Sequence, residues 1–145
     1  MPAEAGRAAL PEPALVRVNS EADVIVARQR GREMAAEIGF NVTDQALIAT
    51  AISELARNIL QYARTGEVSV QPTSKKGRAG LVIVASDQGP GIANVTEAMQ
   101  DGYSTNGGLG LGLPGSRRLV DEFEVETELG RGTVITARKF LPAEG

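Results

Sequence analysis

The stretch Gly107-Gly108-Leu109-Gly110-Leu111-Gly112-Leu113-Pro114-Gly115 is dense in glycine. Glycine carries no side chain, so the backbone N–H groups of such a segment can approach a polyphosphate closely. The Pro-Gly pair at its end predicts a short helix over about 114–122, whose free N–H groups and positive dipole end suit a phosphate chain. The regular spacing of the leucines indicates packing on one side, which argues against a flexible linker.

This stretch differs from two familiar phosphate loops. A dinucleotide fingerprint follows a buried strand directly, whereas here the segment Gly102–Asn106 comes before the glycines. A Walker loop ends in Gly-Lys-Ser or Gly-Lys-Thr, and that ending is missing here. The His-Arg-Asp and Asp-Phe-Gly signatures of ordinary protein kinases also do not occur in the sequence. Other motifs must therefore decide the kind of site.

Glu54 and Asn58 stand four residues apart on a predicted helix that Thr43 or Asp44 caps and Gly66 ends. Residues at this spacing share one helix face, about 6 Å apart along the axis. The pair flanks an apolar stripe, so a cleft between helix and sheet would expose a carboxylate and an amide oxygen. The amide oxygen suits Mg²⁺, which usually shares its coordination sphere with substrate phosphates. The plain alternative is a Glu and an Asn that simply face water.

Asp87 follows the predicted strand Leu81–Ser86 and precedes Gly89-Pro90-Gly91, so its carboxylate stands at a strand end beside a sharp turn. Such a carboxylate can accept an amino N–H from a purine, although an ordinary Asp-x-Gly turn explains the same residues. Gly132-Thr133 opens the last predicted strand. The threonine hydroxyl there would join Asp87 at a base, directly or through water.

The rest of the chain of 145 residues reads as one domain. We expect residues 1–14 to form a mobile tail and residues 15–141 a single folded domain. Apolar residues recur at helical spacing from Glu21, after a cap at Asn19 or Ser20, to Gly39, and again through the helix that carries Glu54. Strand patterns cover Leu15–Val18, Glu67–Gln71, Leu81–Ser86, Glu124–Glu128 and Thr133–Phe140. The order predicts an α+β fold, a two-layer α/β sandwich with a mixed sheet and helices on one face.

Composition excludes several classes of chemistry. The chain has neither Cys nor His, which removes disulfides, the usual zinc sites and thiol or histidine catalysis. A net charge of -3 gives no positive electrostatic field that would attract nucleic acid. We interpret Lys75-Lys76-Gly77-Arg78 as a solvated loop. The longest aliphatic run, Leu81–Ala85, is too short to cross a bilayer, so we expect a cytoplasmic protein with no membrane contact.

Taken in order, these motifs resemble the N, G1, G2 and G3 boxes of the Bergerat-fold ATPases, the superfamily of gyrase, heat-shock protein 90, histidine kinases and MutL. Three segments, Ala51–Ile59, Asp87–Ile92 and Asp101–Gly115, are similar to the RsbT branch of the anti-sigma-factor-like serine/threonine kinases. The resemblance covers about residues 15–141.

The resemblance implies a role for each matching residue. Glu54 would be the general base and Asn58 the Mg²⁺ ligand, while Arg57 would contact phosphate or the protein substrate. Residues 92–106 would be a short lid over ATP. The implied nucleotide-binding set is Asn58, Asp87, Gly89, Gly91, Gly107, Gly108, Leu109, Gly110, Leu111, Gly112 and Thr133.

The resemblance also implies an activity. Members of the branch transfer the γ-phosphate of ATP, with Mg²⁺, to a serine or threonine of a STAS-domain scaffold protein of the stressosome. The kinase is then released to a downstream regulator. Without histidine this chain cannot phosphorylate itself as a sensor kinase does, so it needs a substrate in trans. The rival reading is an anti-sigma module that uses nucleotide to hold a partner. An autonomous ATPase is disfavoured by the short lid and the missing transducer domain.

Overall fold

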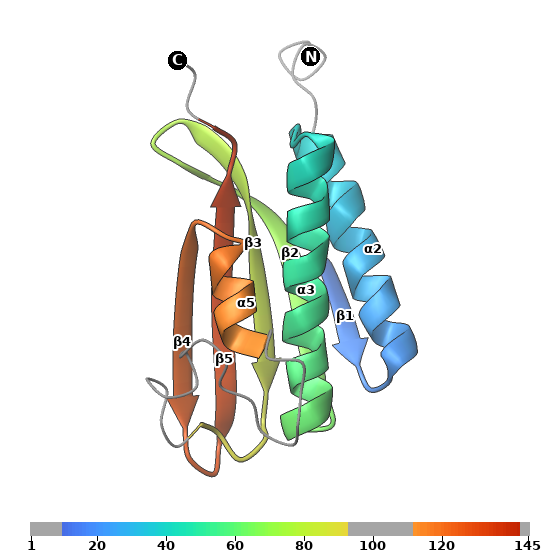
Figure 1. Cartoon of the computed structure of the whole chain (residues 1–145), viewed down its shortest axis with the longest axis vertical. Coiled ribbons are helices and arrows are strands. Elements are labelled where there is room, and N and C mark those ends of the chain that lie inside the picture. Colours follow the sequence, from blue (N-terminus) through green and yellow to red (C-terminus); the bar gives the residue numbers. More distant parts are fainter. Residues whose placement is uncertain (1–9, 93–111, 143–145) are drawn as a thin grey trace.

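The computed structural model describes residues 10–92 and 112–142. Its elements follow in chain order (Figure 1): β1 (Ala14–Val18), α2 (Glu21–Ile38), α3 (Val42–Tyr62), β2 (Gly66–Lys75), β3 (Arg78–Asp87), α5 (Gly112–Arg118), β4 (Glu122–Glu128) and β5 (Gly132–Phe140). β1 begins at Ala14, one residue inside the expected tail. No helix among the described residues has the length and apolar character needed to span a bilayer.

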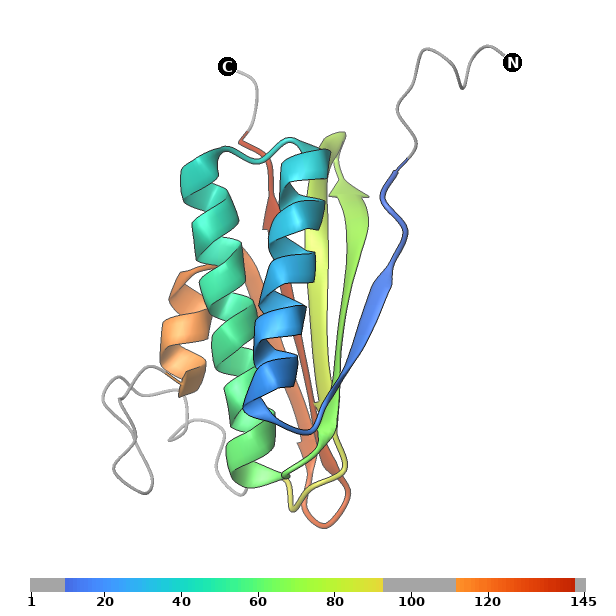
Figure 2. The ribbon, with the colours of Figure 1, turned by 90° about the vertical axis from the view of Figure 1, so that its right-hand side faces the viewer.

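The elements form two layers, as expected: the three helices that the structure describes lie on one face of the sheet (Figure 2). The strand order is β1-β2-β3-β5-β4. Every pairing of the described strands is antiparallel, so the expectation of a mixed sheet was wrong in this respect. The connection through α5 makes β4 run in the direction of β3, but β5 inserts between these two strands and pairs with both.

The two long helices match the sequence pattern, with corrections at their ends. α2 begins after Ser20, whose N–H donates to the Asp23 carboxylate at 3.1 Å, and it ends at Gly39 with a φ of 119°. α3 is capped neither by Thr43 nor by Asp44. The side chain of Asn41 accepts from the Asp44 N–H at 2.7 Å instead.

The C-terminal end of α3 also differs from the expectation. The helix stops at Tyr62 with Ala63 as its cap, because Arg64 adopts a φ of 72°, and Gly66 opens β2 instead of ending the helix. The helical spacing of apolar residues predicts Tyr62 as the last member of the stripe on α3, but this residue is 47% exposed. The stripe itself is buried: Ile48, Ala51, Ile52, Leu55 and Ile59.

Close approach of α2 to α3 depends on Gly31. A Cβ at this position would lie 2.0 Å from the Cδ1 of Ile52, so a larger residue would require the end of this buried side chain to move. The sheet supplies the other half of the core through alternate residues. Val18, Val68, Ile83 and Ala137 are each at most 1% exposed and belong to the core beneath the helices.

Two segments were predicted with the wrong length. β2 and β3 continue as far as Lys75 and Arg78, so the expected basic loop is a two-residue turn in which Lys76 and Gly77 have φ values of 53° and 79°. Positive φ at both positions suits a tight hairpin turn. The helix expected over about 114–122 spans Gly112–Arg118, and β4 already begins at Glu122.

Candidate functional site

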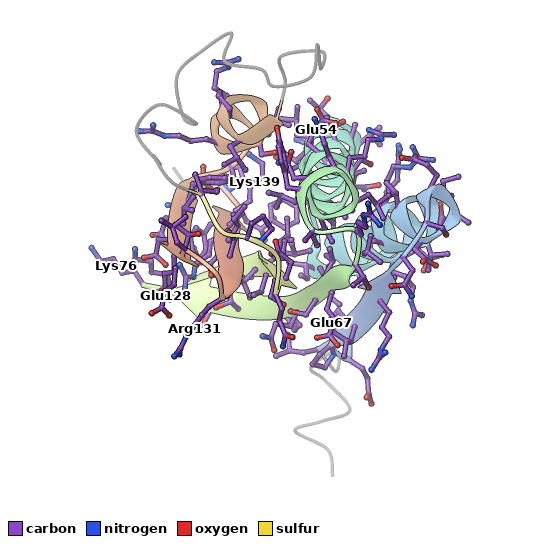
Figure 3. All side chains as sticks on the ribbon, turned by 90° about the horizontal axis from the view of Figure 1, so that it is seen from below. Glu54, Glu67, Lys76, Glu128, Arg131 and Lys139 are labelled. Carbon is purple, nitrogen blue, oxygen red and sulfur yellow. The ribbon has the colours of Figure 1, made fainter. Side chains whose placement is uncertain are left out.

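Glu54 and Asn58 lie on adjacent turns of α3, as the sequence predicts. The side chain of Glu54 is only 14% exposed and lies on the side of α3 that faces α5 (Figure 3). α3 holds this position because the apolar residues on either side of the pair are buried in the core. A carboxylate is thus fixed at the border between the helix layer and solvent.

Arg57 joins Glu54 to the neighbouring helix. Its Nη1 donates to the Oε1 of Glu54 at 3.1 Å, and its Nε lies 3.7 Å from the Oε1 of Glu21 at the start of α2. The guanidinium is half-exposed, so screening by water keeps each ion pair weak. The geometric effect is that one oxygen of Glu54 is engaged while Oε2 has no hydrogen bond among the described residues.

Asn58 carries a buried polar group without a partner. Its Nδ2 is shielded from solvent and makes no hydrogen bond among the described residues. Leaving a buried amide unpaired costs about 1–3 kcal/mol. Because the two ends of an amide have nearly the same shape, rotation about χ2 exchanges the nitrogen for the oxygen. The residue can therefore offer either a donor or an oxygen ligand to a bound group.

Asp87 is the last residue of β3, and its carboxylate organises the turn that follows. Oδ1 accepts the N–H of Gly89 at 2.8 Å, while Oδ2 has no hydrogen bond among the described residues. Gly89 is required at this point because a Cβ there would lie 2.6 Å from the Cβ of Ala63. The turn thus packs against the C-terminal end of α3 and leaves one carboxylate oxygen for a ligand.

Thr133 stands directly opposite Asp87 in the β3–β5 register, and the side chains at both positions point to the helix-covered face of the sheet. Gly132 makes this approach possible. It has a φ of 126°, and a Cβ there would come within 2.1 Å of the Asp87 carbonyl oxygen. Thr133 is buried, with 7% of its surface exposed.

The segment after the turn is tied to the β4–β5 hairpin. The N–H of Gly130 donates to the Pro90 carbonyl at 3.0 Å, and that of Ile92 donates to the Thr127 hydroxyl at 2.8 Å. Gly91 has a φ of 81°, and a Cβ there would lie 2.6 Å from the Glu128 carbonyl oxygen. The backbone therefore runs in close contact with the hairpin before it reaches residue 93.

The two groups of site residues meet through Gly66. A Cβ on Gly66 would lie 2.8 Å from the Ile59 side chain of α3 and 3.2 Å from the Cβ of Asp87. Ile59 directly follows Asn58, so Asp87 and Thr133 lie beside the last turns of the helix that carries Glu54 and Asn58. The fold brings the carboxylate, the amide and the strand-end pair to one end of the molecule.

A hollow of about 660 Å³ opens at the same end of the sheet but does not coincide with these residues. Its lining includes Asp87 but neither Glu54 nor Asn58. Glu67, Ser86 and Val134 also line it, and the alternation of the strands puts their side chains on the face without helices. Figure 3 shows Glu67 on the opposite side of the sheet from Glu54. We therefore do not assign this hollow to the nucleotide.

Some predicted residues lie outside the described part of the chain. Gly107, Gly108, Leu109, Gly110 and Leu111 belong to this group, as does most of the expected lid. Gly112 is described as the first residue of α5. Sequence reasoning missed Gly66, which packs against Asp87, and Thr127, which hydrogen-bonds to Thr133. Thr127 was detectable as the polar residue at an inward position of β4, where Phe123 and Val125 contribute to the core.

Comparison with known proteins shows the family of this chain. A family model described as Histidine kinase-, DNA gyrase B-, and HSP90-like ATPase matches residues 43–144. The chain is 52% identical over 126 residues to the serine/threonine-protein kinase RsbT of Bacillus subtilis (strain 168), which covers 87% of this chain and 95% of that one. It is 28% identical over 115 residues to the anti-sigma F factor of Thermoanaerobacter sp. (strain X514), covering 76% and 80% respectively.

Solved structures share the fold at lower sequence identity. A structure of the RsbU and RsbW domains of a Mycobacterium tuberculosis protein gives a TM-score of 0.59 at 22% identity, over 92% of this chain and 34% of that one. The mycobacterial sensor histidine kinase MprB gives a TM-score of 0.52 at 20% identity, over 89% and 96%. At these identities the likeness concerns the fold alone.

Proposed function

The chain belongs to the histidine kinase-, DNA gyrase B- and HSP90-like ATPases and, within them, to the RsbT branch of serine/threonine protein kinases, and from this premise we propose that it phosphorylates a serine or threonine of a STAS-domain scaffold protein with ATP. The observation that carries the proposal is the meeting of two half-sites at one end of the fold. Glu54 and Asn58 come from α3, and Asp87 and Thr133 from the central strands.

Adenine is assigned to the strand-end half of the site. Asp87 has a carboxylate oxygen left after it binds the Gly89 N–H, and this oxygen can accept from an exocyclic amino group. Gly89 and Gly132 let the backbone pass close to Asp87, and Gly91 lets it pass close to the β4–β5 hairpin. We propose Gly107–Gly112, the segment that ends at the first residue of α5, as the phosphate-binding segment. Most of its residues are glycines, whose lack of a side chain lets backbone N–H groups approach a phosphate.

Mg²⁺ fits the other half. Asn58 is the side chain proposed to hold it, because its buried Nδ2 has no partner among the described residues and rotation about χ2 would put the amide oxygen there as a ligand. When bound, the ion would neutralise charge on the phosphates. No group of three or more His, Cys, Asp or Glu side chains with metal-binding geometry occurs in the described residues.

Glu54 is proposed as the base that orients and deprotonates the incoming hydroxyl. Phosphoryl transfer depends mainly on alignment and charge stabilisation, so a single well-placed carboxylate is sufficient protein chemistry. Arg57 engages Oε1, and Oε2 has the freedom to accept the substrate proton. Because the chain contains no histidine, it has no acceptor for the autophosphorylation that a sensor kinase carries out, which favours an acceptor on another protein.

We further propose that phosphorylation of the scaffold releases the kinase to a downstream regulator in the cytoplasm, as in partner switching. The similarity to anti-sigma F factors favours one competing function, in which the same pocket uses nucleotide to sequester a partner without phosphorylating it. Fold likeness does not separate these two functions.

Incubation with labelled ATP and candidate STAS-domain proteins separates the two functions. A kinase transfers label to the partner, whereas a sequestering module forms a nucleotide-dependent complex without label. Glu54→Gln keeps the shape of the side chain and a partner for Arg57, so we expect ATP affinity to stay within about twofold while transfer falls by about 10²- to 10⁴-fold. Glu37→Gln, an exposed glutamate of α2, is the matched control and should transfer normally. Normal transfer by Glu54→Gln would remove Glu54 as the base.

A further inference from the structure

The hydroxyl of Thr127 on β4 has three hydrogen-bonding neighbours. The N–H of Ile92 lies 2.8 Å from Oγ1, the carbonyl oxygen of Gly132 3.1 Å, and the hydroxyl of Thr133 2.9 Å. Thr127 and Thr133 stand directly opposite each other in the β4–β5 register. This hydroxyl therefore connects the segment leaving the Asp87 turn with the residue that faces Asp87 across the sheet.

Counting hydrogens fixes the direction of each bond. A threonine hydroxyl has one hydrogen and two lone pairs. The N–H of Ile92 can only donate, so it occupies one lone pair of Thr127, and the carbonyl of Gly132 can only accept, so it takes the hydrogen. The second lone pair is then left for Thr133, which must donate. All three contacts are hydrogen bonds at once only in this arrangement.

We propose that Thr127 is a positioning residue for the base end of the nucleotide site. It accepts the hydrogen bond that the Thr133 hydroxyl donates, so that Thr133 presents only lone pairs beside Asp87. The inference rests on the proposed function, because it requires a base at the Asp87–Thr133 pair. Two adjacent acceptors favour a ligand edge that brings donors, such as the amino group of adenine or a water molecule held between base and protein.

The first test needs no variant. Nuclear magnetic resonance on the free wild-type protein should show a slowly exchanging hydroxyl hydrogen on Thr133, with a through-space contact to the Thr127 side chain, and addition of ADP should leave this contact in place. A Thr133 hydroxyl that exchanges freely, or that turns from Thr127 to the nucleotide, would overturn the proposal.

The second test is calorimetry with adenosine, ADP and ATP. Thr127→Val keeps the shape and removes the hydroxyl, so the affinity for all three ligands should fall by the same factor, about three- to tenfold, as expected for one neutral hydrogen bond. Thr127→Ser should stay within about twofold of wild type. Thr136→Val, on β5 but on the helix-free face, is the control and should bind normally.

A double variant decides whether Thr127 acts through Thr133. In a Thr133→Val background, Thr127→Val should change the affinity by less than about twofold. An undiminished effect in that background, or a loss confined to ATP, would mean that Thr127 merely holds Ile92, and the proposal would fail. If the wild-type protein bound none of the three ligands, the proposed function would fall instead, while the resonance of the free protein would still decide the direction of the Thr133 hydrogen bond.

Discussion

Replacement of Asp87 by Asn separates the two tasks of this carboxylate. One oxygen accepts the Gly89 N–H at 2.8 Å, and we assign the other to the base. Asparagine has a single acceptor oxygen, so its side chain can accept a hydrogen bond from the Gly89 N–H or from the base, but not one at each end of the amide. If the amide oxygen stays on Gly89, an NH₂ donor faces the amino group of the base. If the side chain turns over, the Gly89 bond is lost.

The size of the effect follows from this exchange. A hydrogen bond to a charged group contributes about 1.5–3 kcal/mol, and each 1.4 kcal/mol is a tenfold change in affinity. We therefore expect Asp87→Asn to weaken ADP and ATP binding by about 10- to 100-fold in isothermal titration calorimetry. The free energy of unfolding in urea should change by less than about 1.5 kcal/mol, because one neutral hydrogen bond replaces a charged one at a partly exposed turn.

Asp121→Asn is the matched control. Asp121 also has a carboxylate oxygen that accepts a backbone N–H, that of Phe140 at 2.8 Å, but it lies outside the proposed site. The control should reproduce any stability change and leave nucleotide affinity intact. Undiminished ATP affinity in Asp87→Asn would refute the assignment of the base to this carboxylate. An equal loss of ATP affinity in both variants would show that the substitutions weaken binding only by destabilising the fold.

Two further predictions concern the backbone and the sheet edge. Gly132→Ala places a Cβ 2.1 Å from the Asp87 carbonyl and adds strain at a φ of 126°, so it should destabilise the fold by about 2–4 kcal/mol in urea and weaken nucleotide binding. Gly130→Ala, at a φ of 82° with no atom within 4 Å of its Cβ, should cost only about 1–2 kcal/mol, and equal losses would contradict the close-approach argument. Glu122 accepts a hydrogen bond from Lys75, which, with the charges of Lys75 and Arg138, lowers the pKa of this carboxyl below 4.5 against a smaller opposing effect of desolvation. The contribution of Glu122 to the free energy of unfolding is therefore present above its unfolded pKa and disappears as the pH falls through the lowered folded pKa. Glu122→Gln should thus reduce the difference in the free energy of unfolding between pH 7 and strongly acidic pH. The control Glu126→Gln should not reduce it.

Local pattern was sufficient for the helices and for much of the site. The stripe on α3 fixes which face of that helix is buried, and this alone puts Glu54 and Asn58 together at the edge of the core. Asp87 was found because a carboxylate at the end of a strand, followed by glycines, can adopt few backbone conformations other than a sharp turn. The roles assigned to these residues remain proposals, and Gly107–Leu111 lie outside the described residues.

The sequence by itself determined the elements, their buried faces and the residues that can do chemistry, since hydrophobic period and turn residues act over a few positions of the chain. Only the tertiary structure decided that β5 lies between β3 and β4, that Thr127 meets Thr133, and that Glu21 reaches Arg57. Alternation buries the same side chains whichever strand is the neighbour, so it does not encode strand order. That order follows from contacts between residues far apart in the chain, and these contacts bring Thr133 to Asp87.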